Sequence, residues 1–263
     1  MNDISNTALV TLKCHVQDAK RNNAVLNDMR SLIAYEFLQS KLDEKGRNML
    51  SRRIRKNLVN HTVLRAKKYD DYVIQFLQSY PEAMIVNIGC GLDHRFSRID
   101  NGKCVFLDLD LPDIINIKNK IFPSTDRYLQ NGQSVFEYSW LNEIAGKHVL
   151  LLAEGVFMYC QEEDVKSLFN EIHAKIPGAD IVLEVFSSKW LMGWKKRMVD
   201  IKLQKQLKFG KGASFRFGIV DSDEIETWSE DYKLIEDWSY FDEIRKNTKE
   251  YLRKLQWTVY YKL

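Results

Sequence analysis

A short apolar run that ends at two closely spaced glycines constrains the fold of this chain most. Residues 84–88 have the composition of a buried parallel strand, and Gly89 ends the run. Gly91 follows after one residue, and a second apolar run covers residues 104–108. Glycines in this position let the backbone approach a ligand at the carboxyl end of a strand. The pattern therefore predicts a ligand-binding loop after a buried strand.

Apolar runs and helical patterns alternate along the chain. Residues 1–80 and residues 161–176 have apolar positions at helical spacing. Further strands are predicted at the runs 148–152, 181–186, 234–238 and 257–261. This alternation predicts an α/β fold with a mostly parallel sheet and helices on both faces. The last two runs are expected to form an antiparallel C-terminal edge.

Composition excludes several classes of protein. The 263 residues are 45% hydrophobic and 29% charged, and their formal net charge of +3 is too small to indicate a nucleic-acid partner. The four cysteines are far apart, which predicts reduced thiols and neither a metal site nor a disulfide framework. No signal-peptide pattern and no apolar run of membrane length is present. We therefore expect a cytoplasmic protein with no membrane partner, and the oligomeric state is not predicted.

The residue at position 94 helps to distinguish the possible ligands, because dinucleotide-binding loops have a third glycine there. His94 stands there, and its bulk opposes close packing of a pyrophosphate. S-adenosylmethionine has no pyrophosphate, so the loop favours this cofactor over a nicotinamide or a flavin. Asp108 and Asp110 follow the glycines by about 20 residues and are candidates to bind the ribose hydroxyls. The alternative is a structural turn that binds no ligand.

Four blocks of sequence resemble a known family, in the same order. They are Arg65 ahead of Tyr69-Asp70-Asp71, the loop 86–96, the run 107–112 and the run 152–159. Together they resemble the leucine carboxyl methyltransferase family, and within it the bacterial branch of the tetracenomycin polyketide O-methyltransferase type. The resemblance covers nearly the whole chain. It implies a class I methyltransferase with a Rossmann-like, seven-stranded sheet that transfers a methyl group from adenosylmethionine to oxygen.

The resemblance implies roles for residues around the methionine part of the cofactor. Arg65 would pair with the cofactor's carboxylate. Gly89 and Gly91 would pass beside its methionine portion. Glu154 would face its ammonium or sulfonium end.

The nucleoside part of the cofactor is assigned to other positions by the same resemblance. Asp110 would hold the ribose, with Asp108 as the competitor for that role. Glu137 and Tyr138 lie in the loop 136–140, which falls where the family contacts the adenine. Asp93, in the glycine loop, is counted with the cofactor-binding residues.

Catalysis depends on the acceptor, which we expect to be a small, polyketide-like molecule with a carboxyl or hydroxyl group. A carboxylate is already ionised at neutral pH, whereas a hydroxyl benefits from a general base. His94, where the family has threonine, and Tyr159 are the candidate bases, and a structural role for His94 is the alternative. The lack of an obvious base motif favours a carboxyl acceptor. Other possibilities are methylation of a protein C-terminal carboxylate and a cofactor-binding regulatory protein without turnover.

The chain is expected to divide into two parts. Residues 1–80 would form a helical extension that caps the substrate, and residues 81–263 would form the adenosylmethionine-binding core. A basic helical insertion is expected around residues 188–218. Its charges, within 195–216, form either a solvated helix face or a lid over an anionic acceptor. The basic run 52–56 predicts another solvated helix face.

Overall fold

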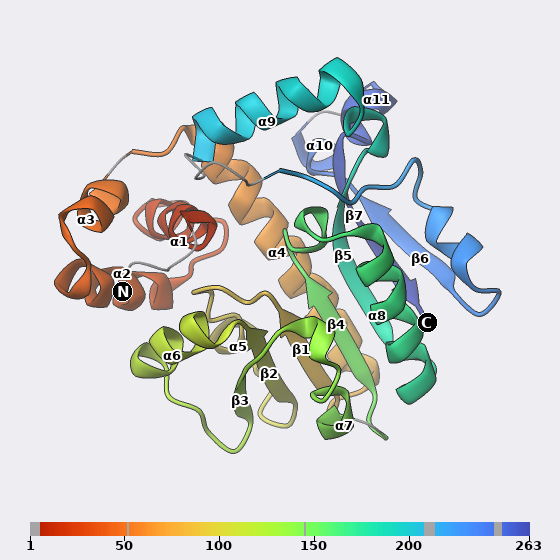
Figure 1. The fold of residues 1–263 in the computed structure, drawn as a ribbon. Coiled ribbons are helices and arrows are strands. Elements are labelled where there is room, and N and C mark those ends of the chain that lie inside the picture. The colour runs from red at the N-terminus through yellow and green to blue at the C-terminus, as the bar shows by residue number, and fades with distance from the viewer. Residues whose placement is uncertain (1–5, 52, 145, 208–213, 245–248) are drawn as a thin grey trace. The chain divides into compact units, whose positions relative to one another are not determined.

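Seven strands form one sheet in the order β3-β2-β1-β4-β5-β7-β6 (Figure 1). A computed structural model of the chain describes residues 6–51, 53–144, 146–207, 214–244 and 249–263. The strands are β1 Met84–Ile88, β2 Val105–Asp110, β3 Tyr128–Gly132, β4 Val149–Ala153, β5 Asp180–Phe186, β6 Lys233–Trp238 and β7 Gln256–Lys262.

The direction of the strands agrees with the sequence pattern. β1 pairs with β4, β4 with β5 and β2 with β3, all in parallel. β7 pairs with both β5 and β6 in antiparallel fashion. β1, β4 and most of β5 are buried, as expected for apolar runs covered on both faces. The predicted α/β fold with a mostly parallel sheet and an antiparallel C-terminal edge is confirmed.

β3 is a strand that the sequence pattern did not predict. It lies at the edge of the sheet, and only Tyr128 among its residues is buried. Gln130 and Asn131 interrupt its apolar pattern. An edge strand has one neighbour and less surface to bury, so its composition gives a weak signal.

Helices account for most of the remaining chain. They are α1 Asn6–Ala19, α2 Met29–Lys41, α3 Glu44–Ser51, α4 Lys56–Ser79, α5 Phe96–Ile99, α6 Pro112–Ile121, α7 Leu141–Ile144, α8 Glu162–Lys175, α9 Gly193–Leu207, α10 Tyr240–Ile244 and α11 Glu250–Arg253. The helical character predicted for residues 1–80 and 161–176 is confirmed by α1–α4 and α8 for the described residues, and residues 1–5 lie outside them. The helix face predicted at the basic run 52–56 is wrong for residues 53–55, whereas Lys56 begins α4 and residue 52 lies outside the described residues. Residues 53–55 have no regular structure, and Arg55 has an extended backbone before α4 begins. Like charges at helical spacing repel, which disfavours a continuous helix there.

The chain packs as two compact units. The first unit consists of Met1–Glu82 and Cys90–Gln133, and the second of Ala83–Gly89 and Ser134–Leu263. In the first unit, α1 packs against α2 and α4. In the second, α8 buries Val165, Leu168, Phe169 and Ile172, at the spacing that the sequence predicts. The division at residue 80, with residues 1–80 as a substrate cap, stays a prediction.

Two further expectations concern thiols and membranes. Cys14, Cys90, Cys104 and Cys160 are free thiols. Within the described part of the chain, no helix combines the length and the apolar composition needed to cross a membrane. The cytoplasmic location stays a prediction.

Candidate functional site

The two glycines after β1 adopt a backbone conformation that other residues rarely take. Gly89 has φ +62° and Gly91 has φ +54°. In the second unit, a Cβ atom at Gly89 would lie 2.5 Å from Cγ2 of Val156. In the first unit, a Cβ atom at Gly91 would lie 3.6 Å from Cβ of Ala8. Position 89 therefore requires glycine for both its backbone and its space, and position 91 mainly for its backbone.

Asp110 ties the glycine loop to the end of β2. Its Oδ2 accepts a hydrogen bond of 2.8 Å from the N–H of Gly91, and its Oδ1 accepts one of 2.7 Å from the N–H of Leu111. The residue is half-buried, and burial raises the pKa of its carboxyl although the two N–H groups oppose this. Each carboxylate oxygen has a further lone pair, so Asp110 can still accept hydrogen bonds from a ligand.

Asp108 has a different environment although it is only two residues away. It is fully buried, with Nζ of Lys118 at 2.7 Å and the hydroxyl of Tyr128 at 2.6 Å from its Oδ2. Burial lowers the pKa of Lys118, but the charge of Asp108 outweighs burial and raises it. This carboxylate therefore neutralises a buried ammonium group, whereas Asp110 has no such partner among its hydrogen bonds to Gly91 and Leu111. The choice of Asp110 over Asp108 as the ribose ligand stays a prediction.

Asp93 is held by two arginines. Its carboxylate accepts hydrogen bonds of 2.7 and 3.0 Å from Nη1 and Nη2 of Arg98, and Nη2 of Arg95 lies 3.5 Å away. Burial alone raises the pKa of Asp93, but the two guanidinium groups outweigh it and hold the pKa well below its usual range. Its oxygens are thus engaged inside the first unit, and its role as a cofactor ligand stays a prediction.

Arg98 connects Asp93 to two further helices. It donates a hydrogen bond of 2.6 Å to Asp70 on α4, and its Nη1 lies 3.3 Å from Asp28 at the start of α2. Nδ1 of His15 on α1 lies 2.9 Å from the same Asp28 carboxylate. We call Arg98, Asp28, Asp70, Asp93 and His15 the arginine-centred network. Sequence reasoning did not find this network, because its members come from segments far apart in the chain.

Part of this network has the composition of a metal site. His15, Asp28 and Asp93 offer ligand atoms within 4.8 Å of one another. However, Nη1 of Arg98 lies 2.7 Å from Asp93 and 3.3 Å from Asp28. The guanidinium group thus supplies the positive charge that a metal ion would bring.

His94 is enclosed by aromatic rings. Its ring centre lies 4.3 Å from that of Phe122, 4.8 Å from that of Tyr128 and 6.4 Å from that of Phe96. The residue is 8% exposed, and burial together with the charge of Lys118 lowers its pKa to about 4. His94 is therefore neutral at pH 7 and a weak base, which favours the packing role over the catalytic one. The catalytic role itself stays a prediction.

Arg65 lies on α4, in the first unit. It is half-buried, and its charge acts on the thiol of Cys14 on α1, whose pKa burial raises to about 11. The thiol is therefore protonated at neutral pH. The predicted pairing of Arg65 with the cofactor's carboxylate stays a prediction.

The second unit contains the other predicted site residues. Glu154 follows β4 directly and is half-buried. Glu137 is exposed and accepts a hydrogen bond from the N–H of Ser134 that caps a short helical turn. Tyr138 has φ +55°, and its hydroxyl donates to Oγ of Ser167 at 3.1 Å. Their roles at the cofactor stay predictions.

Tyr159 packs into an apolar cluster of the second unit. Its ring centre lies 5.1 Å from that of Phe215. Met158, Phe186 and Leu203 belong to the same cluster. The ring of this candidate base thus packs against aromatic and aliphatic side chains.

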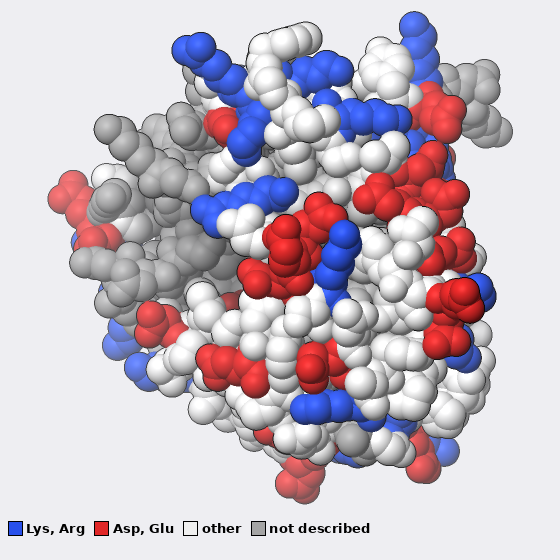
Figure 2. Space-filling view, turned by 45° about the vertical axis from the view of Figure 1, so that its right-hand side comes forward, with Lys and Arg blue, Asp and Glu red and all other residues white. Residues whose placement is uncertain are grey.

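The basic segment is described in part. Nζ of Lys196 donates to Oγ of Ser214 at 2.6 Å and to the carbonyl of Phe215 at 2.9 Å. Lys195 lies over the ring of Trp190. Figure 2 shows Lys and Arg side chains gathered at the upper edge of the displayed face. Residues 208–213, with Gly210 and Gly212, lie outside the described residues, so the lid and the solvated face both stay predictions.

Known proteins resemble this chain in both sequence and fold. Residues 17–136 match the model of the leucine carboxyl methyltransferase family. The tetracenomycin polyketide synthesis O-methyltransferase TcmP of Streptomyces glaucescens is 26% identical over 246 residues, which cover 91% of this chain and 84% of TcmP.

Solved structures share the fold at low sequence identity. Magnesium protoporphyrin IX methyltransferase (ChlM) of Synechocystis PCC 6803, with bound SAH, matches with a TM-score of 0.51 and 9% identity, over 88% of this chain and 98% of that chain. A DUF574 family protein of Streptomyces avermitilis matches with a TM-score of 0.58 and 10% identity, over 90% and 98% of the two chains. The predicted resemblance to the leucine carboxyl methyltransferase family is therefore confirmed, and the fold is the Rossmann-like one of class I methyltransferases.

Proposed function

We propose that this protein is an S-adenosylmethionine-dependent O-methyltransferase that acts on a carboxyl or hydroxyl group of a small, polyketide-like molecule. The observation that carries the proposal is the hydrogen bond between Asp110 and the N–H of Gly91. This bond holds the half-buried carboxylate at the end of β2 beside Gly91, whose backbone has a left-handed conformation. The similarity to TcmP and to the leucine carboxyl methyltransferase family supports the choice of reaction.

The chemistry of the predicted contacts supports this cofactor. Gly89 packs against Val156 too closely for a Cβ atom, so this point of the loop carries no side chain. Asp110 would accept hydrogen bonds from the ribose hydroxyls, Arg65 would pair with the carboxylate, and Glu154 would face the positive end. When bound, S-adenosylmethionine supplies a methyl group on a sulfonium.

Arg65, Asp110 and Glu154 would hold the cofactor, which would supply its methyl group to an oxygen of the acceptor. With a carboxylate acceptor no proton is released, whereas a hydroxyl loses one. The protein's contribution is to hold the acceptor in line and to exclude water.

A carboxyl acceptor agrees best with the environment of the candidate bases. His94 is enclosed by rings and has a pKa lowered to about 4. Tyr159 lies against Phe215 in an apolar cluster. A carboxylate needs neither of them, since it is ionised at neutral pH. Methylation of a protein C-terminus and a regulatory protein without turnover stay as alternatives.

Mass spectrometry tests the proposal directly. The purified protein is incubated with S-adenosylmethionine and a metabolite extract, and we expect an extract compound to gain the mass of one methylene. Mild alkali then separates the two acceptor types, since it hydrolyses methyl esters and leaves methyl ethers intact. Asp110→Ala should reduce the gain at a cofactor concentration near the Kd of the wild type. No gain with the wild type in any extract fraction would contradict the proposal.

A further inference from the structure

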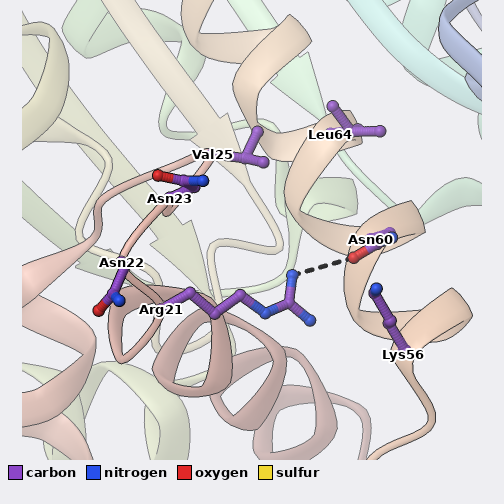
Figure 3. Close-up of a pocket in the computed structure, with 7 residues that line it drawn as sticks. All are labelled: Arg21, Asn22, Asn23, Val25, Lys56, Asn60 and Leu64. Atoms are coloured by element: carbon purple, nitrogen blue, oxygen red, sulfur yellow. Dashed lines mark hydrogen bonds between the residues drawn. The ribbon is translucent and has the colours of Figure 1, made fainter.

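An open pocket lies in the first unit, between the α1–α2 connection and the N-terminal half of α4 (Figure 3). Its volume is about 640 Å³, within the range of small-molecule sites. The residues that line it are Arg21, Asn22, Asn23, Val25, Lys56, Asn60 and Leu64. The proposed cofactor contacts use none of these side chains.

The charge of the pocket is positive. Arg21 and Lys56 are cationic, three lining residues are asparagines, and none of the seven is acidic. Among the residues that the structure describes, none forms an ion pair with Lys56. Figure 3 shows the end groups of Arg21 and Lys56 turned toward each other across the pocket. Two cations that face each other without an acid between them favour an anionic ligand.

The arginine is held in place before any ligand arrives. Its Nη1 donates a hydrogen bond of 3.0 Å to Oδ1 of Asn60 and lies 3.5 Å from the buried carboxylate of Asp18. Asp18 also accepts hydrogen bonds from the N–H groups of Val25 and Leu26. These contacts fix the loop and orient the guanidinium group, so less conformational entropy is lost on binding.

The pocket also offers apolar surface. Val25 is 40% exposed, and Leu64 is half-buried on the facing helix. A small inorganic anion would leave these side chains without a partner. A ligand that combines a carboxylate with an apolar body matches both the cations and the two aliphatic side chains.

We propose that this pocket binds the carboxylate of an organic acid with an apolar body. The site goes beyond the proposed function, because none of its seven lining residues is a predicted cofactor contact.

Calorimetric titration of the full-length protein with 2-naphthoate tests the pocket, with uncharged 2-naphthamide as the matched ligand. We expect naphthoate to bind and naphthamide to bind at least about tenfold more weakly, the effect of a charge-assisted hydrogen bond. Arg21→Gln and Lys56→Gln should each weaken naphthoate binding by about tenfold. Lys20→Gln is the control, because Lys20 is adjacent to Arg21 in sequence and does not line the pocket. No described residue forms an ion pair with Lys56, so Lys56→Gln should leave the fold unchanged.

Three results would overturn the inference. They are equal binding of naphthoate and naphthamide, unchanged binding in both pocket variants, and displacement of naphthoate by an equal concentration of inorganic phosphate. Titration with S-adenosylhomocysteine keeps this test separate from that of the proposed function. Loss of naphthoate binding with intact S-adenosylhomocysteine binding contradicts the pocket alone. The reverse result contradicts the methyltransferase proposal and leaves an organic-acid site.

Discussion

Asp108 and Asp110 differ in environment because they differ in position along β2. Asp108 lies inside the strand and is fully buried, whereas Asp110 ends the strand and is half-buried. The first compensates the buried ammonium of Lys118, and the second accepts the N–H of Gly91. A carboxylate that neutralises a buried charge stabilises the fold, while a carboxylate at a strand end is available to a ligand.

Alanine substitutions at the two aspartates should therefore affect different properties, ligand binding for Asp110 and stability for Asp108. We expect Asp110→Ala to weaken S-adenosylhomocysteine binding by about 1–3 kcal/mol while the fold stays intact, the cost of hydrogen bonds to a charged group. Asp108→Ala leaves Lys118 buried without its partner and should lower the free energy of unfolding by about 3–5 kcal/mol. Calorimetric titration and urea unfolding of both variants measure the two effects. Weaker ligand binding in a stable Asp108→Ala protein would reverse the assignment.

Gly89 allows a comparison between backbone strain and lack of space. Gly89 and Gly102 both have positive φ, but a Cβ atom at Gly89 would meet Val156 at 2.5 Å, and at Gly102 it would meet nothing within 4 Å. Gly102→Ala should cost about 1–2 kcal/mol of unfolding free energy from backbone strain alone. Gly89→Ala should cost about 1–3 kcal/mol more, because the β-branched Val156 must move. If Gly89→Ala and Gly102→Ala lower the free energy of unfolding equally, Val156 can move aside without loss of stability, and the lack of space at Gly89 does not matter.

Sequence reasoning at this scale identified residue types and positions but not their surroundings. The glycines and Asp110 follow a local pattern, since a strand, a turn and the next strand end are close in sequence. The sequence does not tell that Asp108 meets Lys118, or that Phe122 and Tyr128 enclose His94. These contacts depend on the packing of α6 and β3, and β3 itself gave only a weak signal.

At the scale of elements, the arginine-centred network fastens three N-terminal helices to the glycine loop. Arg98, on α5, contacts Asp70 of α4, Asp28 at the start of α2 and Asp93 of the loop. Asp28 also caps α2 by accepting the N–H of Ser31. One guanidinium group can serve several carboxylates because its donors form a rigid fork. The shape of the loop and the placement of these helices are thus coupled through Arg98.

Removal of Arg98 should therefore destabilise the first unit strongly. Arg98→Met leaves Asp70 and Asp93 buried with less positive charge, and we expect a loss of about 3–5 kcal/mol of unfolding free energy. Arg98→Lys keeps the charge but not the fork, and its loss should be smaller. Arg127→Met is the control, because Arg127 pairs with Asp100 near the surface and its loss should change the free energy of unfolding little. Equal effects of Arg98→Met and Arg127→Met in urea unfolding would contradict a stabilising network.

For the molecule as a whole, local sequence patterns predicted the fold but not which segments make up each compact unit. Strands with clear apolar runs and the late antiparallel pair were found because both signals are local. The two units combine segments separated in the chain, such as Met1–Glu82 with Cys90–Gln133. No local pattern carries that information. The sequence did not predict the pocket at Arg21 and Lys56 for the same reason. Its residues come from the α1–α2 connection and from α4, which are separated in the chain.

Binding of S-adenosylhomocysteine should stabilise the whole protein. A ligand that binds only the folded chain adds about 2.7 kcal/mol at a hundredfold excess over its Kd. For a protein of this size, that corresponds to a rise in Tm of about 5–10 °C. We expect this rise in a thermal unfolding experiment with the wild type and with Asp113→Ala, which removes an exposed carboxylate three residues after Asp110. Asp110→Ala should show a smaller rise at the same ligand concentration, and NAD should give none. A rise with NAD and none with S-adenosylhomocysteine would show that the glycine loop serves a different cofactor.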